Sequence, residues 1–199
     1  MNRRRTLITS PLDWFLSANP VPPPALPVLA ERGGTQLKTP RPVLVVDTRE
    51  QNPFDFSRFQ GWFSGIERRA LKLGDYSIVG LEDICVVERK NLPDLVRSFT
   101  VERKVFVDRL RQMAGYPHRL LVITAALSQI KSPYPYSATK PNQIMQSVMA
   151  VLAGLQLPFL CTETHELGEE LLASYLYQVH LYHWLETNGH GSCLTDGDL

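Results

Sequence analysis

Residues 74–94 read GDYSIVGLEDICVVERKNLPD, and the rest of the chain is organised around this stretch. Its centre, ICVV at residues 84–87, is an apolar run that predicts a buried strand. Because side chains alternate along a strand, Glu88 and Lys90 are expected on one face and Arg89 on the other. Charged groups at the end of a buried strand are costly unless they are paired or bound to a metal ion. The pattern therefore indicates a divalent-metal site with Lys90 beside it.

The same stretch predicts two antiparallel strands. Residues 76–79 form the first, which follows a turn at Gly74 and Asp75 and leads into a hairpin turn at residues 80–83. The second strand then returns alongside the first, which brings Asp75 toward Glu88. The two acids inside the hairpin turn are ordinary turn residues, so we expect no functional role for them.

Composition indicates one domain of ordinary size with an uneven charge. The chain has 199 residues, of which 44% are hydrophobic, and this is enough for a core. The net charge of +1 conceals an asymmetry between the two parts of the chain. Residues 1–124 contain 19 Lys and Arg and 13 Asp and Glu, whereas residues 125–199 contain 2 Lys and Arg and 7 Asp and Glu. A basic first half suggests a local surface for a polyanion rather than a generally adhesive protein, but the charge alone favours an ordinary solvated face.

Cysteine usage and hydropathy favour a cytoplasmic protein. The three cysteines, Cys85, Cys161 and Cys193, are too widely spaced for metal-ligand pairs, and their odd number gives no disulfide framework. No uninterrupted apolar run of 18 residues occurs, so no transmembrane helix and no membrane association are expected. The first residues are too polar for a signal peptide.

The chain divides into an arm, a domain and a tail. Residues 1–41 are rich in proline and are expected to form a flexible N-terminal arm. Residues 42–187 alternate strand and helix patterns, which predicts an α/β domain with a central mixed sheet flanked by helices. Residues 188–199 are expected to be a disordered tail.

Periodicity places the elements of the domain. Asn91 and Thr164 are the expected caps of two helices. Strands are expected at residues 43–46, 66–73, 76–79, 84–90, 119–124 and 158–162, and helices at 93–99, 100–115, 142–155 and 164–186. The expected packed aromatic residues are Phe54, Phe56, Phe59, Trp62 and Phe63.

The helix over residues 100–115 is expected to be amphipathic. Its apolar stripe comprises Val101, Val105, Phe106, Leu110 and Met113. Its opposite face carries the basic residues Arg103, Lys104, Arg109 and Arg111.

Three ordered motifs carry a resemblance to a known family. VDTRE at residues 46–50, GDYSIVGLED at 74–83 and VVERKNLPDL at 86–95 resemble the nuclease domain of the XPF-type structure-specific endonucleases. The family signature is Gly-Asp, a variable gap, Glu-Arg-Lys, three residues and Asp. This chain matches it with Gly74, Asp75, Glu88, Arg89, Lys90 and Asp94, and matches further family positions with Asp47, Arg49, Glu50 and Arg103. The resemblance covers residues 42–182 and implies a PD-(D/E)XK, restriction-endonuclease-like core.

The resemblance also implies a set of site residues. Asp75 and Glu88 are the expected ligands of Mg²⁺, for which Mn²⁺ is a substitute. Asp47 is a further candidate metal ligand; like Glu50 and Asp94, it could instead hold Lys90, Arg89 or a ligating water. Lys90 is expected to orient or deprotonate the attacking water or to stabilise developing negative charge. The expected catalytic set is Asp47, Glu50, Asp75, Glu88, Arg89, Lys90 and Asp94. The expected DNA contacts are Arg49, Arg103, Lys104, Arg109 and Arg111.

The function implied by the resemblance is metal-dependent DNA cleavage. We expect an endonuclease acting on flap, fork or junction DNA, with its single-strand/double-strand boundaries, in repair, recombination or replication. The alternative is a non-catalytic DNA-binding partner subunit of a nuclease complex, because the family contains degenerate subunits. The chain is similar to compact stand-alone bacterial and phage members, which implies a bacterial or phage-infected cell, work at the nucleoid, and the option of a homodimer. Thr124 departs from the acidic residue that many relatives carry there.

Overall fold

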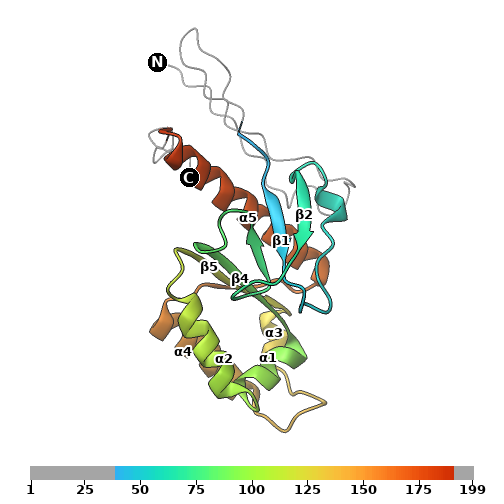
Figure 1. The fold of residues 1–199 in the computed structure, drawn as a ribbon. Coiled ribbons are helices and arrows are strands. Elements are labelled where there is room, and N and C mark those ends of the chain that lie inside the picture. The colour runs from blue at the N-terminus through green and yellow to red at the C-terminus, as the bar shows by residue number, and fades with distance from the viewer. Residues whose placement is uncertain (1–38, 191–199) are drawn as a thin grey trace, which may run out of the picture.

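The fold is a six-stranded mixed sheet covered by helices on both faces, seen in a computed structural model that describes residues 39–190 (Figure 1). The strands are β1 (Val43–Val46), β2 (Gly65–Arg68), β3 (Tyr76–Ile78), β4 (Cys85–Asn91), β5 (His118–Thr124) and β6 (Phe159–Cys161). The helices are α1 (Leu92–Phe99), α2 (Arg103–Met113), α3 (Leu127–Ile130), α4 (Pro141–Leu155) and α5 (His165–Thr187), with a 3₁₀ turn η2 (Ser57–Phe59). The expected α/β class is confirmed. Most of the expected arm and tail, residues 1–38 and 191–199, lies outside the described residues.

The strand order is β2-β1-β3-β4-β5-β6. β3 pairs antiparallel with both β1 and β4, whereas β4, β5 and β6 run parallel to one another. The antiparallel pairing of β3 with β4 confirms the expected arrangement, with Tyr76 opposite Val87. Because α1 follows β4 directly, the residues at the carboxyl end of β4 lie where the sheet meets the first helices.

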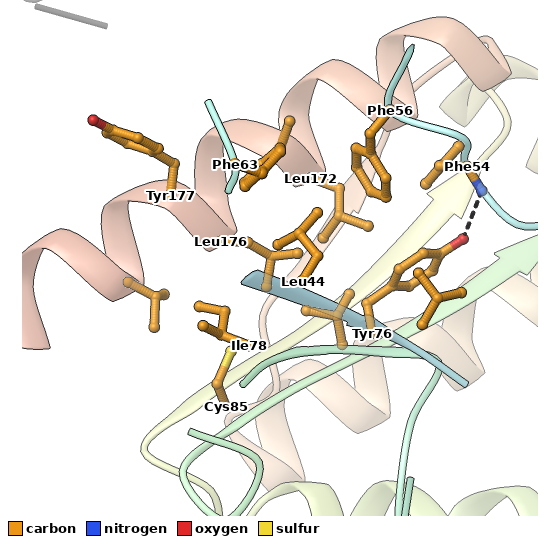
Figure 2. Close-up of a cluster of buried hydrophobic side chains, with 14 of the residues drawn as sticks. Leu44, Phe54, Phe56, Phe63, Tyr76, Ile78, Cys85, Leu172, Leu176 and Tyr177 are labelled. Carbon is orange, nitrogen blue, oxygen red and sulfur yellow. Dashed lines mark hydrogen bonds between the residues drawn. The ribbon is translucent and has the colours of Figure 1, made fainter. Parts of the chain in front are cut away.

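Strand alternation divides the sheet into two packed faces. Val87 and Val122 belong to a core on one side, in which Leu44 and Ile78 pack against Leu172 and Leu176 of α5 (Figure 2). Val86, Leu121 and Ile123 belong to the other core, with apolar residues of α1, α2 and α4. Glu88 and Lys90 therefore follow Val86 toward α1 and α2, and Arg89 follows Val87 toward α5.

The segment between β1 and β2 is held down by its aromatic residues, as expected. All five are buried: Phe54, Phe56, Phe59, Trp62 and Phe63. The backbone N–H of Phe54 also donates to the phenol oxygen of Tyr76, at 2.9 Å (Figure 2). This anchoring places Glu50 and Asn52, just before Phe54, over the end of β3.

The strand expected at residues 66–73 is shorter in the structure and ends at Arg68. The physical reason is a set of hydrogen bonds between two residues that follow β1, Asp47 and Arg49, and the backbone of Leu71. The Asp47 carboxylate accepts a 2.6 Å hydrogen bond from the Leu71 N–H, and the Arg49 guanidinium donates to the Leu71 carbonyl at 2.7 Å. These bonds replace the ladder bonds that would continue β2, so the chain turns toward the site. The short α3 and η2 were not predicted.

Helix α2 starts at Arg103 and exposes two residues that were expected in its apolar stripe. Phe106, Leu110 and Met113 are buried as predicted, but Val101 is 83% exposed and Val105 68% exposed. Val101 precedes the first turn, and Val105 is displaced from Phe106 by one residue, or roughly 100° around the axis. The expected caps are correct: Asn91 accepts from the Asp94 N–H and Thr164 from the Leu167 N–H. No helix within residues 39–190 is long and apolar enough to span a membrane.

Helix α5 carries two glutamates into the core. Glu169 accepts a 2.6 Å hydrogen bond from the Phe56 N–H, whereas neither carboxylate oxygen of the fully buried Glu170 has a hydrogen-bond partner. Arg58 Nη2 lies 3.6 Å from Glu170 Oε2. Burial raises the pKa of both carboxyl groups.

Replacing Glu170 by Gln should stabilise the protein at neutral and higher pH. A raised pKa means that the folded state binds the proton more tightly than the unfolded state, so stability is greatest below the unfolded-state pKa and falls as pH rises through the folded-state pKa. Gln cannot ionise, so the advantage of Glu170→Gln should grow as pH rises from about 4, the ordinary pKa of a glutamate, into the alkaline range. Thermal denaturation across this range measures the difference.

Glu166→Gln is the matched control. Glu166 is exposed in the first turn of the same helix, and hydrogen bonds from its own N–H and from Thr164 lower the pKa of its carboxyl. The ionised Glu166 stabilises the folded state above the unfolded-state pKa, and this stabilisation is lost as pH falls. The effect of Glu166→Gln on stability should therefore depend on pH in the opposite sense to that of Glu170→Gln. A Glu170→Gln difference that stays constant with pH would contradict the account of a buried, ionisable core glutamate.

Candidate active site

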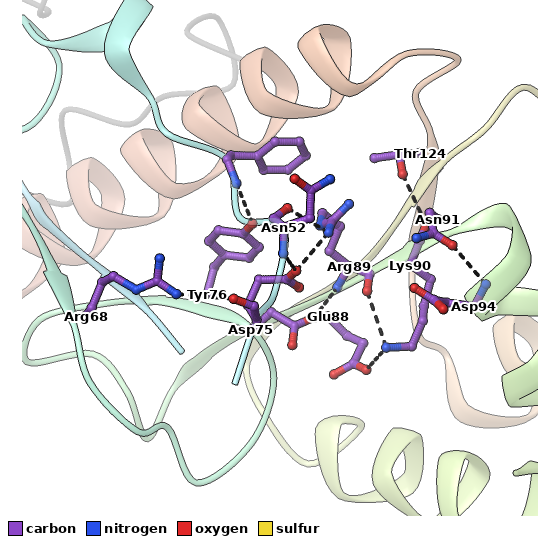
Figure 3. Close-up of polar contacts among 12 residues, drawn as sticks. Asn52, Arg68, Asp75, Tyr76, Glu88, Arg89, Lys90, Asn91, Asp94 and Thr124 are labelled. Atoms are coloured by element: carbon purple, nitrogen blue, oxygen red, sulfur yellow. Dashed lines mark hydrogen bonds and ion pairs between the residues drawn. The ribbon is translucent and has the colours of Figure 1, made fainter. Parts of the chain in front are cut away.

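Most of the expected site residues gather around a cleft at the carboxyl end of β4. Figure 3 shows Asp75, Glu88, Arg89, Lys90 and Asp94 close together there. The cleft has a volume of about 260 Å³ and lies between the segments at residues 47–51 and 72–75, β4 and α2. Its lining comprises Asp47, Arg49, Glu50, Gln51, Lys72, Leu73, Gly74, Asp75, Arg89, Lys90, Asp94 and Arg109. Polar and charged groups dominate this surface, as a site for a phosphate-bearing substrate requires.

Glu88 is the most deeply placed carboxylate of the site. Its side chain is fully buried, and its Oε1 atom lies 2.6 Å from Lys90 Nζ and 3.1 Å from Arg109 Nη1 (Figure 3 shows the Lys90 contact). The Oε2 atom is buried and has no hydrogen-bond partner. The Glu88–Lys90 contact confirms that the two side chains share one face of the strand. Lys90 Nζ also lies 5.5 Å from the centre of the Phe106 ring, which limits where it can point.

Asp75 lies next to Glu88 at the start of β3. Its Oδ2 atom accepts a 2.7 Å hydrogen bond from the Arg89 N–H, and its own N–H donates to the Val87 carbonyl at 2.7 Å. Burial, followed by the negative charge of Glu88, raises the pKa of the Asp75 carboxyl to about 7, although the Lys90 charge opposes this shift. Two neighbouring carboxylates with an unfavourable mutual charge make this position attractive to a cation.

Asp47 connects the segment after β1 with the segment after β2 at the edge of the cleft. Its Oδ1 atom accepts from the N–H and Nε of Arg49, and its Oδ2 atom accepts from Arg49 Nη2 and the Leu71 N–H, at 2.6–2.9 Å. Burial opposes ionisation, but these bonds outweigh it and lower the pKa of Asp47. The guanidinium of Arg49 is thereby held at the edge of the cleft, with 64% of its side chain exposed.

Arg89 and Glu50 form an ion pair on the α5 side of the sheet. The Arg89 guanidinium donates to Glu50 Oε1 and to the Asn52 carbonyl, each at 2.8 Å, and lies 5.4 Å from the centre of the Phe54 ring. Only 6% of Arg89 is exposed. Its side chain therefore braces the segment after β1, while its backbone N–H orients Asp75.

Asp94 lies in the first turn of α1 and lines the cleft from the exposed side. Its N–H donates to the Asn91 side chain at 2.8 Å. Asp94 is thus brought to the same cleft as Asp75 and Lys90, as expected.

The basic residues of α2 do not form the single face that was expected. Arg109 points to Glu88, but Arg103 Nη1 donates to Ser147 of α4 at 2.9 Å, because Arg103 lies on the same side of the helix as Phe106 and Leu110. Arg111 pairs with Asp108 at 2.6 Å, away from the cleft lining, and Lys104 is exposed.

Two polar residues of the cleft were not singled out from the sequence. Gln51 and Lys72 line it beside the signature positions. Their closeness in sequence to signature positions could have pointed to them: Gln51 directly follows Glu50, and Lys72 comes two residues before Gly74. Asn52 was also missed, because it acts through its backbone carbonyl rather than its side chain.

The donor set fits a hard divalent cation. Glu88 Oε2 is a buried carboxylate oxygen without a hydrogen-bond partner, and Asp75 is a neighbouring carboxylate whose ionisation is disfavoured in the absence of further positive charge. Carboxylate oxygens are the ligands that Mg²⁺ and Mn²⁺ prefer. Within residues 39–190 no three His, Cys, Asp or Glu side chains converge on a common metal position. Asp75 and Glu88 are thus a pair of candidate ligands, separate from Asp47, both of whose oxygens accept hydrogen bonds.

Comparison with known proteins shows the family and the fold of this chain. Residues 46–175 match the ERCC4 domain family. The fold is similar to that of XPF from Aeropyrum pernix, with a TM-score of 0.55 and 19% sequence identity over 69% of this chain. It is likewise similar to XPF from Aeropyrum pernix in complex with DNA, with a TM-score of 0.54 and 20% identity over 70% of this chain. The chain spans 61% and 64% of the lengths of these two structures. No curated protein matches significantly.

Proposed function

Because the chain belongs to the ERCC4 domain family, with the XPF-type nuclease domain, we propose that it is a metal-dependent endonuclease that hydrolyses phosphodiester bonds in branched or junction-containing DNA. The family is one of DNA nucleases, and the cleft is lined by the signature positions Gly74, Asp75, Arg89, Lys90 and Asp94. The remaining one, Glu88, is fully buried and contacts Lys90 and Arg109 of the lining. The observation that carries the proposal is the buried Glu88, with one oxygen held by Lys90 and the other without a partner, beside Asp75.

Three basic residues of the cleft have different roles in the proposed hydrolysis. Lys90 is held against Glu88 and the Phe106 ring, so its ammonium group has a fixed position from which to orient water or stabilise negative charge on the phosphate. Arg49 is held by Asp47 at the rim, where a planar guanidinium suits a phosphate oxygen. Arg89 has the different role of bracing Asp75 through its backbone N–H.

Asp75 and Glu88 would hold the metal ion. Mg²⁺ or Mn²⁺ bound there would supply a Lewis acid to polarise the phosphate and activate water. Asp47, Glu50 and Asp94 then act as positioning residues: Asp47 through Arg49, Glu50 through Arg89, and Asp94 through its place at the rim.

One observation favours a second candidate, a non-catalytic DNA-binding subunit. The carboxylates of the cleft form ion pairs and hydrogen bonds, and within the described part of the chain no group of three converges as a ready metal site. A subunit of this kind would bind DNA through Arg49 and Arg109 and leave cleavage to a partner.

Cleavage of a substrate panel separates the two candidates. The purified chain is incubated with labelled flap, fork, Holliday-junction, duplex and single-stranded DNA, in Mg²⁺ and in excess EDTA. The proposed nuclease cuts at least one branched substrate in Mg²⁺ and none in EDTA. Binding without cleavage on every substrate identifies the non-catalytic candidate, and cleavage that persists in EDTA contradicts the metal-dependent mechanism.

Arg109→Gln should weaken DNA binding more than Arg103→Gln does. Arg109 lines the cleft, whereas Arg103 is bonded to Ser147 of α4. Loss of one phosphate contact should lower the magnitude of the slope of log affinity against log salt by about 1. Fluorescence anisotropy at several salt concentrations measures this slope. Equal losses of DNA affinity in the two variants would instead support the original expectation that Arg103 and Arg109 contact DNA from one basic face of α2.

A further inference from the structure

The loop between α3 and α4 carries a stacked pair of tyrosines. The rings of Tyr134 and Tyr136 have centroids 5.9 Å apart and planes inclined by 23°. Tyr134 is 6% exposed, belongs to the core with Ile130, and its hydroxyl donates to the Ile130 carbonyl at 2.5 Å. Tyr136, by contrast, is 50% exposed. A half-exposed ring thus lies on a second ring that is fixed in the core.

The loop is preorganised by its prolines. Pro133 and Pro135 flank Tyr134, and Pro141 follows as the first residue of α4. Each proline fixes its own φ and restricts the residue before it. The side chain of Ser137, next to Tyr136, accepts a hydrogen bond from the Thr139 N–H at 3.2 Å. An aromatic surface held in this way loses little conformational entropy when a ligand stacks on it.

Positive charge flanks the same loop. Lys131 and Lys140 are the only two Lys or Arg residues in residues 125–199, which otherwise carry seven acids. Both are exposed, and Lys131 forms a hydrogen bond to the Asn142 side chain at the start of α4. Within an acidic half of the chain, the positive charge is thus placed at the two ends of the tyrosine loop.

The loop follows α3, the short helix that begins after the carboxyl end of β5. β4 and β5 are parallel and in register, with Asn91 opposite Thr124, and α3 begins just after β5 as α1 begins just after β4 (Figure 1). Tyr134 belongs to the same core as Leu95 and Phe99 of α1. Tyr134 therefore shares a core with α1, the helix that begins directly after the cleft strand β4.

We propose that Tyr136, stacked on Tyr134 and flanked by Lys131 and Lys140, is a platform for a base of an unpaired DNA strand. Aromatic rings stack on bases of any sequence, but in a duplex the faces of the bases are already covered by their neighbours. The lysines supply charge for the backbone phosphates on either side. The platform rests on the proposed function, in which it binds the unpaired strand of a branched substrate while the duplex passes the cleft.

Binding of unpaired DNA without metal tests the platform. Labelled oligothymidine and a duplex of matched length are titrated with protein in EDTA, and anisotropy gives both affinities. Tyr136→Ala should weaken oligothymidine binding by roughly ten-fold to a hundred-fold and change duplex binding by less than about two-fold. Tyr136→Phe keeps the ring and should bind like the wild type. Tyr182→Ala, a partly exposed tyrosine in the second half of α5, is the matched control and should change neither affinity.

A second measurement separates stacking from misfolding. An abasic position moved along the oligothymidine removes one base at a time. In the wild type, one abasic position should reproduce the loss caused by Tyr136→Ala, whereas Tyr136→Ala protein should bind the abasic and intact strands alike. Lys131→Gln and Lys140→Gln should each reduce the salt slope by about 1 and leave the abasic effect in place.

The outcomes distinguish this proposal from the proposed function. If the wild type binds branched and duplex DNA but Tyr136→Ala binds oligothymidine as tightly as the wild type does, the platform is wrong and the nuclease proposal is unaffected. If the wild type binds no DNA, both proposals fail. A loss that is the same for oligothymidine and duplex, with no position-specific abasic effect, also overturns the platform.

Discussion

Glu88→Gln and Asp75→Asn should each lower DNA cleavage on the order of 10³-fold while DNA binding is retained. The amide keeps the shape of the carboxylate but removes the negative charge that a hard cation requires. Glu88 Oε2 is buried and without a hydrogen-bond partner, and Asp75 is the neighbouring carboxylate, so these two are the proposed ligands. Single-turnover cleavage at several Mg²⁺ concentrations, together with anisotropy in EDTA, measures both effects.

Lys90→Ala is the variant that separates metal binding from the chemical step. Lys90 contacts Glu88 and the Phe106 ring, so its loss should slow cleavage and leave the metal dependence largely unchanged. Raising Mg²⁺ or supplying Mn²⁺ should partly rescue Asp75→Asn but not Lys90→Ala. Near wild-type cleavage by Glu88→Gln would refute the assignment.

Stability provides an independent check on the same variants. The pKa of Asp75 is raised to about 7, so in the metal-free protein its ionisation lowers stability as pH rises through that value. Asp75→Asn should therefore have a higher melting temperature than the wild type at about pH 8 in EDTA. A loss of cleavage accompanied by this gain in stability reflects a missing ligand rather than a damaged fold.

Gly74→Ala should destabilise the protein by about 3 kcal/mol or more. Gly74 has a φ of +77°, and an added Cβ would lie 2.5 Å from Val86 Cγ2 and 2.8 Å from the Val87 carbonyl oxygen. The left-handed conformation and the collision with the central strand both oppose a side chain here. Urea denaturation of the variant gives the loss in free energy of unfolding.

Gly80→Ala is the matched control for this effect. Gly80 has a φ of +83°, but an added Cβ would meet no atom within 4 Å. It should therefore show only the conformational cost, about 1 kcal/mol. Equal losses for the two variants would mean that β4 moves away from the new side chain without cost.

The sequence predicted those parts of the site that depend on local geometry. Alternation along β4 placed Glu88 and Lys90 together, and the turn at Gly74 brought Asp75 to them. The helix caps at Asn91 and Thr164 were likewise local, because each side chain bonds an N–H three residues ahead.

The parts that the sequence did not predict depend on contacts between distant segments. The hydrogen bond that the Leu71 N–H donates to Asp47 ends β2, although residues 66–73 alternate weakly as a strand would. Arg103 was assigned to an open face because the partner of its guanidinium is Ser147, 44 residues away on α4. Neither partner can be read from the spacing around the residue itself.

The contact of Arg109 with Glu88 has a thermodynamic consequence. The Arg109 guanidinium pairs with Glu88 in this structure. On the proposed function, the same guanidinium pairs with a phosphate of bound DNA. DNA that draws Arg109 away leaves Glu88 with more uncompensated negative charge and so increases its affinity for a cation. Linkage is reciprocal, and the cation must then tighten DNA binding by the same factor. On the proposed function, DNA and the metal ion are therefore expected to be coupled ligands, each of which strengthens the binding of the other.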